Sequence, residues 1–204
     1  MNDAPAASPS TPFAEPTPLG LLGLAIGCAA LVPIAFGKVA TPAGFSTAAW
    51  FCLLFGGGGQ LLAGLMALAN KNLLGGTLFT TFSFNWIINW WVLSGIAEGR
   101  LPDPTITLSV DVCFLVIFAV LTVAFAFYSG LLAIFLIDID LLYIFRILKE
   151  VLGTKALGMP IALCTVALAA IALWLAFAIL VNQAAGRPVF KVPGPWLEAG
   201  PAGG

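Results

Sequence analysis

Long apolar runs alternate with short polar connectors along most of the chain. Six such runs lie at about 19–36, 48–69, 77–97, 107–129, 134–152 and 161–181. Each has about 20 residues, enough at ~1.5 Å per residue to cross a ~30 Å hydrocarbon core as an α-helix. The connectors "KVATPAG", "NKNLLGG", "EGRLPDP" and "GTKALGMP" supply the Gly, Pro and Asn residues that end helices. The pattern predicts an all-α integral membrane protein with six transmembrane helices.

The fourth and fifth runs are separated only near Ser129 and Gly130, which is the weakest boundary. One long bent helix is the alternative there, but a stretch of more than about 40 residues favours two crossings. We therefore expect a six-helix domain over residues 18–183, an N-terminal tail over 1–17 and a C-terminal tail over 184–204. The N-terminal tail and the last stretch of the C-terminal tail, "PGPWLEAGPAGG" (193–204), are rich in Pro, Ala and Gly and are expected to be disordered.

Composition agrees with a membrane as the solvent. The 204 residues are 61% hydrophobic and 8% charged, whereas a soluble domain is about 25% charged. A net charge of −1 offers no basic surface for nucleic acid. Six crossings put both termini on one side, but the positive charges are balanced and do not orient the chain. Those on the side of the termini are Lys71, Arg187 and Lys191, and those on the other side are Lys38, Arg100 and Lys155.

Residues suited to catalysis are scarce. The sequence has no histidine, and its four cysteines stand alone inside apolar runs, where they suit small buried side chains. The chain therefore lacks the histidines and paired cysteines that usually bind zinc or haem, and the histidine that usually serves in acid–base catalysis. The motifs HExxH and GxSxG and a phosphate loop do not occur. We expect neither an enzyme nor a cofactor.

Small residues gather in the first two runs. Gly23 and Gly27 form a GxxxG pair of the kind that lets membrane helices approach closely. Four consecutive glycines, 56–59, exceed what packing needs and indicate a bend or backbone that lines a narrow lumen. Gln60 follows them, and its amide is either satisfied by packing or exposed to the lumen.

The stretch "FLIDIDLLYIFRILKE", residues 135–150, concentrates charge in an apolar run. At about 100° per residue, one stripe of the helix about 120° wide contains four of these charges, Asp138, Arg146, Lys149 and Glu150. Asp140 lies outside this stripe. Arg146 and Glu150 are four residues apart and suited to an ion pair. Charges inside a membrane face a bundle interior or water. The stripe is therefore either a polar pore wall or a structural ion-pair network, unless its last turn already lies at the interface.

Three segments resemble the acetate uptake transporter family, the YaaH-type succinate–acetate permeases. "EPTPLGLLGL" resembles the NPAPLGL signature that opens the first helix of that family. "FGGGGQLLAGLMALANKNLLGGTLFTTFSFNW" is similar to its second and third helices, and "LWLAFAILVNQAAGRPVFKVPGP" to the close of its sixth. The resemblance covers about residues 15–97 and 161–195.

The resemblance implies a six-helix protomer with one pore, assembled as a homo-hexamer in the inner (plasma) membrane with cytoplasmic termini. It implies passage of acetate and similar small monocarboxylic acids, linked to protons, through an apolar constriction at Leu24, Phe82 and Tyr143. Ala172 falls at a position that tunes substrate size. Side chains expected to line the pathway or bind substrate are Gln60, Thr77, Thr80, Thr81, Asn85, Arg146 and Glu150, and Asp138 and Asp140 are expected to relay protons or charge.

The chain also departs from the family pattern. Glu15 replaces the leading Asn of the signature, Ala67 replaces a glutamate of the second helix, and Phe82 stands where the family has Tyr. Tyr143, in turn, takes an aliphatic position. The threonines and Asn85 are also suited to holding helices together. Two further functions stay open: a pore for a neutral solute such as urea or ammonia, and a membrane subunit that transports nothing.

Overall fold

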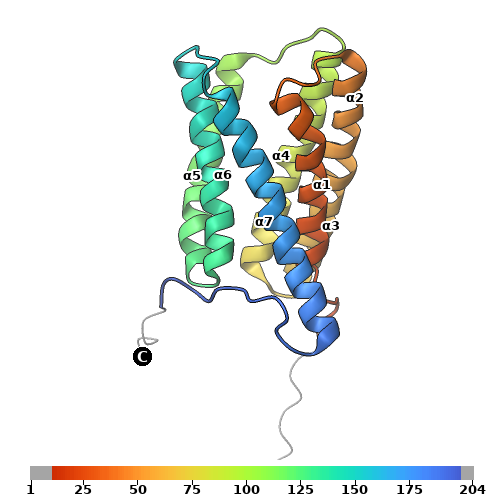
Figure 1. The fold of residues 1–204 in the computed structure, drawn as a ribbon, viewed down its shortest axis with the longest axis vertical. Coiled ribbons are helices and arrows are strands. Elements are labelled where there is room, and N and C mark those ends of the chain that lie inside the picture. The colour runs from red at the N-terminus through yellow and green to blue at the C-terminus, as the bar shows by residue number, and fades with distance from the viewer. Residues whose placement is uncertain (1–10, 199–204) are drawn as a thin grey trace, which may run out of the picture.

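The computed structural model describes residues 11–198, which contain helices and no strand. Eight elements follow one another, of which α2, η1 and α3 join without a break, so that residues 11–198 form six helical rods running alternately up and down (Figure 1). The elements are α1 (Thr17–Ala35), α2 (Pro42–Phe51), the π-helix η1 (Cys52–Gly59), α3 (Gln60–Ala69), α4 (Leu73–Ala97), α5 (Pro104–Ala126), α6 (Gly130–Val151) and α7 (Gly158–Ala185). Residues 1–10 and 199–204 of the two expected tails lie outside the described part.

Capping residues set where several rods begin. Thr41 accepts a hydrogen bond from the backbone N–H of Gly44 at 3.1 Å, with a proline at the first helical position of α2. Asn72 caps α4 in the same way, and Asp103 caps α5. A side-chain acceptor at this position satisfies N–H groups that the helix itself leaves unpaired. The helices therefore start a few residues before the apolar runs, at polar residues that hydrophobicity alone does not include.

The boundary near Ser129 is a break between two helices, as expected. α5 ends at Ala126 and α6 begins at Gly130, so the two rods form an antiparallel hairpin. The alternative of one long bent helix is wrong.

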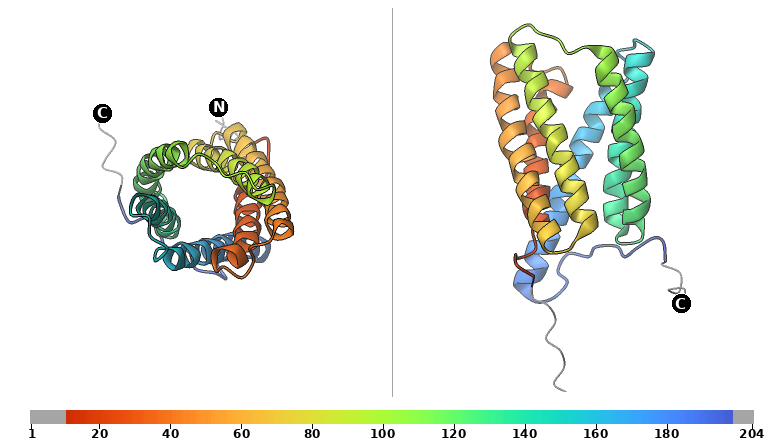
Figure 2. Two further views of the ribbon diagram at one scale, coloured as in Figure 1. Left: turned by 90° about the horizontal axis from the view of Figure 1, so that it is seen from above. Right: turned by 180° about the vertical axis from the view of Figure 1, so that it is seen from behind.

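Seen from above, the rods stand in a ring (Figure 2). α1 packs extensively against α7, α5 against α6, and α4 against the α2–η1–α3 rod, while α6 also contacts α7. α4 and α5 contact each other much less than these neighbours do, although one short loop joins them. The core of the molecule follows the inner face of this ring and draws buried side chains from the rods around it.

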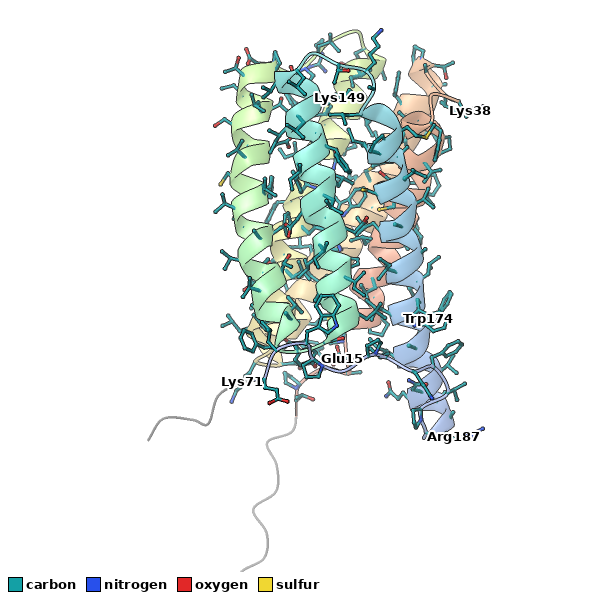
Figure 3. The ribbon with its side chains drawn as sticks, turned by 60° about the vertical axis from the view of Figure 1, so that its left-hand side comes forward. Glu15, Lys38, Lys71, Lys149, Trp174 and Arg187 are labelled. Atoms are coloured by element: carbon teal, nitrogen blue, oxygen red, sulfur yellow. The ribbon has the colours of Figure 1, made fainter. Side chains whose placement is uncertain are left out.

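Four helical segments within residues 11–198 are long and apolar enough to cross a membrane: Thr17–Ala35, Pro42–Ala69, Pro104–Ala126 and Gly158–Ala185. Large apolar side chains such as Leu54, Val116 and Leu163 are exposed on the outside of the bundle. Labelled charged side chains lie at its two ends (Figure 3), Lys38 and Lys149 at one end and Glu15, Lys71 and Arg187 at the other. Such a surface suits lipid around the middle and water at the ends. The chain is a multi-pass membrane protein.

The ends of the described chain make hydrogen bonds to the bundle, including residues 11–16 and 193–198, which belong to stretches that composition predicts to be disordered. The backbone of Phe13 exchanges two 3.0 Å hydrogen bonds with the side chain of Asn70. Near the end of α7, the Asn182 side chain accepts hydrogen bonds from the N–H groups of Val189 and Phe190, which follow the helix, at 2.7 and 2.8 Å. The chain then crosses beneath α6 (Figure 1), where the N–H of Gly130 donates to the Gly194 carbonyl at 2.8 Å. We call residues 187–198 the C-terminal strap.

The glycine-rich stretch forms the π-helix η1, which packs against α1 and α4. A Cβ atom on Gly23 of α1 would lie 2.5 Å from the carbonyl oxygen of Phe55. A Cβ atom on Gly56 would lie 2.4 Å from the indole ring of Trp86. The glycines thus let η1 approach α1 backbone to backbone and make room for one aromatic ring of α4. Close packing therefore accounts for Gly23 and for Gly56, although the run of four glycines was expected to mark a bend or a lumen wall.

Candidate substrate pathway

Aromatic side chains fill the middle of the ring. Phe82 from α4 meets Phe118 from α5 edge to face, with ring centroids 5.1 Å apart. Tyr143 from α6 stacks on Phe118 at 5.6 Å and on Phe114 at 5.7 Å. Leu24 of α1 is fully buried in the same core cluster. Four rods thus contribute to one packed apolar layer, which we call the central layer: Leu24, Phe82, Phe118 and Tyr143.

One cavity lies between the central layer and the end of the bundle away from the termini. This far cavity has a volume of about 190 Å³. Phe82 and Tyr143 form part of its wall, so the central layer borders it directly. The remaining lining comes from α1, α4, α6 and α7: Cys28, Leu31, Ile34, Ala35, Asn85, Trp86, Asn89, Ile139, Leu142, Arg146, Ile161, Thr165 and Leu168.

A second cavity lies toward the termini. This near cavity has a volume of about 290 Å³, and its lining includes Leu21 and Phe79, each three residues before a member of the central layer. Three residues advance a helix by about 4.5 Å, close to one turn. Glu15 also lines the near cavity, and its carboxylate accepts a 3.0 Å hydrogen bond from the backbone N–H of Thr17. The central layer therefore lies between two chambers.

The wall of the far cavity carries hydrogen-bond donors on an apolar background. Asn85 and Asn89 of α4 each contribute an amide. The Tyr143 hydroxyl and the Trp86 Nε1 are buried, and neither has a hydrogen-bond partner within residues 11–198. A buried polar atom left in this state points to a ligand or water that completes it. Phenol, indole and amide donors all suit a carboxylate acceptor.

Arg146 adds a guanidinium to the far cavity, and its ionic partner comes from the neighbouring helix. Its Nη2 lies 3.0 Å from Oδ1 of Asp111, and its Nε donates to Oδ2 at 3.1 Å. The guanidinium carbon also sits 5.4 Å from the centre of the Tyr143 ring. The expected pairing with Glu150 is wrong, since Glu150 is exposed and the described residues contain no ion pair between the two.

Sequence reasoning missed Asp111, although a signal for it exists. It is the one charged residue of its apolar run, 18 residues before Ser129, and Arg146 follows Ser129 by 17 residues. In an antiparallel hairpin, residues equally far from the turn lie opposite each other. The ladder of aromatic contacts from Phe114 and Phe118 to Tyr143 follows the same register.

Asp138 and Asp140 point to opposite sides of α6. Asp140 faces α5, where Oδ2 accepts a 2.7 Å hydrogen bond from the Thr122 hydroxyl. Asp138 lies near the Cys164 thiol of α7. One buried carboxylate oxygen of each has no partner in the described part of the chain. Of the five charged residues expected in one stretch, only Arg146 lines the far cavity, and Lys149 and Glu150 are exposed at the end of α6.

The other expected pathway residues divide by position. Asn85 lines the far cavity, whereas the threonines of α4 line neither chamber, and Thr80 donates to the Gly76 carbonyl of its own helix at 2.6 Å. Gln60 is buried in α3, and its Oε1 has no partner among residues 11–198. Ala172 is fully buried in the core of α7. Residues that line neither cavity are Gln60, Thr77, Thr80, Thr81 and Ala172, and residues that sequence reasoning missed are Trp86, Asn89, Asp111 and Phe118.

Comparison with solved structures finds a protein of the same architecture. The structure described as the bacterial acetate channel SatP superposes with a TM-score of 0.79 at 21% sequence identity. The match covers 88% of this chain and 99% of that one. The two proteins share one fold. The acetate-channel fold expected from the three sequence segments is thus confirmed, and this neighbour is a channel, not an enzyme. No family model and no curated protein sequence matches the chain.

Proposed function

We propose that the chain is a membrane channel or transporter that passes acetate and similar small monocarboxylic acids through the centre of its helix ring. One observation carries the proposal: two chambers meet at an apolar layer of Leu24, Phe82 and Tyr143, in a fold shared with an acetate channel. In this proposal the central layer is the constriction of the pathway.

The chemistry of the far cavity supports a short acid as the solute. Moving a free carboxylate into an apolar site is costly, so it needs donors, or a proton, where it meets the layer. The Tyr143 hydroxyl, the Trp86 Nε1 and the Arg146 guanidinium supply those donors. Phe82, which lines the cavity, offers an apolar surface to a methyl group. A constriction of this kind passes a small acid that is neutral or only briefly dehydrated.

We further propose that all six rods cross the bilayer, including α4 and α6, whose polar side chains face neighbouring rods. The termini then lie together on the cytoplasmic side of the plasma membrane, and several protomers assemble as a homo-hexamer. Asp138 and Asp140 exchange protons as the acid passes, with Asp138→Asn altering the dependence of flux on pH. Ala172 keeps the surroundings of the constriction small, and Gln60, Thr77, Thr80 and Thr81 support the helices from behind it.

Flux of labelled acetate into proteoliposomes tests the proposal, run with and without a pH gradient and beside labelled urea. We expect saturable acetate uptake that rises as the external pH falls toward the pKa of the acid. Other short monocarboxylates should compete with it. Equal acetate flux in protein-free vesicles across the pH range would overturn the proposal, and urea flux alone would favour a pore for neutral solutes.

A further inference from the structure

The ion pair between Arg146 and Asp111 joins a residue that lines the far cavity to one that does not. Arg146 lines the far cavity, whereas Asp111 is 8% exposed and stands behind it on α5. The two are joined through both carboxylate oxygens, at 3.0 and 3.1 Å. A guanidinium has five N–H donors, and this fork uses two of them. Arg146 therefore keeps donors for a second acceptor at the cavity wall.

Asp111 holds Arg146 as a carboxylate ligand would. A carboxylate solute in the far cavity would meet the same guanidinium, in the bidentate geometry that Arg favours. The chain thus carries its own copy of the group that we propose it transports. Asp140 is a contrasting case: it faces a neutral hydroxyl, that of Thr122, and does not line the cavity.

The pair also sets the net charge at the far cavity. Among the residues that line it, Arg146 is the one that carries a permanent charge, and Asp111 balances it. Glu150, four residues further along α6, is exposed. The Arg146 side chain is 30% exposed and stands in an apolar-lined cavity, so without Asp111 its guanidinium would attract small anions more strongly than in open water, because the lower dielectric strengthens its field. Strong capture slows release, whereas conduction needs a site that also lets the solute leave.

We propose that Asp111 is a specificity-determining residue: a tethered carboxylate that occupies the Arg146 guanidinium and keeps the far cavity electrically neutral. A passing acid binds briefly to the donors that Asp111 leaves free, or exchanges with Asp111 on the fork, and inorganic anions gain no charged site to occupy. This inference rests on the proposed function. It adds that Asp111 is the residue that keeps binding of the acid weak.

The test compares the full-length protein with the Asp111→Asn variant in proteoliposomes. The variant should show a KM for acetate at least about tenfold lower, together with a lower maximal flux, since binding tightens and release slows. Nitrate, a small anion that cannot take up a proton at these pH values, should inhibit the variant and leave the wild type nearly unaffected.

Two further variants separate charge balance from a structural effect. Asp111→Asn combined with Arg146→Gln is again neutral and should lose the nitrate binding expected of Asp111→Asn, measured by calorimetric titration. Asp140→Asn makes the same chemical change on α6, away from the cavity, and should not bind nitrate in the same titration. If Asp111→Asn is less stable than the wild type, nitrate or acetate should raise its melting temperature by replacing the missing carboxylate. The inference would be overturned if neither anion stabilised the variant.

Direct binding keeps this inference apart from the proposed function. Calorimetric titration of nitrate into detergent-solubilised Asp111→Asn protein should give binding that the wild type lacks, whether or not either protein carries acetate. Absence of wild-type acetate flux contradicts the proposed function alone. Wild-type acetate flux without tighter acetate binding or nitrate inhibition in Asp111→Asn would overturn the role of Asp111 alone.

Discussion

In the proposed pathway, Phe82 is the side chain on which passage through the central layer depends most directly. It borders the far cavity and meets Phe118 edge to face, so it fills the space that a longer acid would need. Phe82→Ala should remove this obstacle at a cost of about 3–5 kcal/mol in folding free energy. We expect butyrate to compete with acetate for the variant and much less for the wild type. Phe84→Ala, on the exposed face of the same helix, is the control. Continued exclusion of butyrate by a folded Phe82→Ala protein would contradict a steric gate.

Arg146 pairs with Asp111 and, in the proposed function, also binds the passing acid, and each role can be tested. Arg146→Gln should lower acetate flux severely, and it should also destabilise the protein by about 3–5 kcal/mol, because it leaves the buried Asp111 carboxylate without its counter-ion. Adding Asp111→Asn should restore the melting temperature in detergent without restoring flux. Adding Glu150→Gln should restore neither, since Glu150 is exposed and not paired with Arg146. Restoration by Glu150→Gln would show that the charges pair within α6.

The partner of Arg146 illustrates what residue patterns can and cannot predict. Helical periodicity places Arg146 and Glu150 near each other on one helix, so their pairing was the natural expectation. The contact actually formed depends on the register between α5 and α6, which periodicity within one helix does not contain. Leu24, Phe82 and Tyr143 were chosen by resemblance, and the structure buries all three in one core cluster. Their role as the gate stays a prediction.

At the scale of helices, hydrophobic runs predicted each of the six rods and the break at Ser129, because length and apolar content are sufficient for that purpose. The conformation of residues 52–59 was harder to predict. Consecutive glycines indicated a bend or a lumen wall, whereas they form a π-helix whose backbone touches α1. Because four consecutive glycines carry no side chains, the sequence does not show which face of this segment packs inward. Its conformation depends on the residues of α1 and α4 that lie opposite.

The packing of η1 predicts a difference between neighbouring glycines. Gly56→Ala should force the Trp86 ring out of position, since the new Cβ would lie 2.4 Å from it. We expect a loss of about 1–3 kcal/mol in stability and reduced acetate flux, because Trp86 lines the far cavity. Gly58→Ala is the matched control, as its Cβ would lie 3.6 Å from the nearest atom, in ordinary contact. Equal melting temperatures for the two variants would argue against this tight packing.

At the scale of the molecule, the C-terminal strap links the end of α7 to the turn between α5 and α6. Composition predicted disorder for residues 193–204, which are rich in Pro and Gly. The hydrogen bonds of residues 193–198 go to residues far away in the sequence, which composition does not reveal. The side chain of Asn182 fixes the first bend, and the backbone of Trp196 donates to the Ala126 carbonyl at 2.9 Å. The strap thereby ties the fifth and sixth helices to the seventh at the end of the bundle that holds the termini.

Loss of the Asn182 side chain should release the strap. In Asn182→Ala, three hydrogen bonds to Val189 and Phe190 disappear. We expect faster amide exchange over residues 189–197 and at Gly130, measured by hydrogen–deuterium exchange in detergent. Gln183→Ala, at the exposed neighbouring position, should exchange like the wild type. Unchanged protection at Gly130 in Asn182→Ala would mean that the strap is held mainly by its other contacts.

The ring of helices is closed least tightly between α4 and α5, which contact each other much less than the other neighbouring helices do. Phe82 and Phe118 face each other where α4 and α5 meet, so a small outward swing of the α5–α6 hairpin would separate the two rings and widen the aperture without any change of rotamer. Spin labels at Ile88 and Val116, both exposed, should report a broader distance distribution than labels at Val116 and Ile144 on the tightly packed hairpin. A distribution equally narrow for both pairs would mean that the aperture changes by side-chain motion alone.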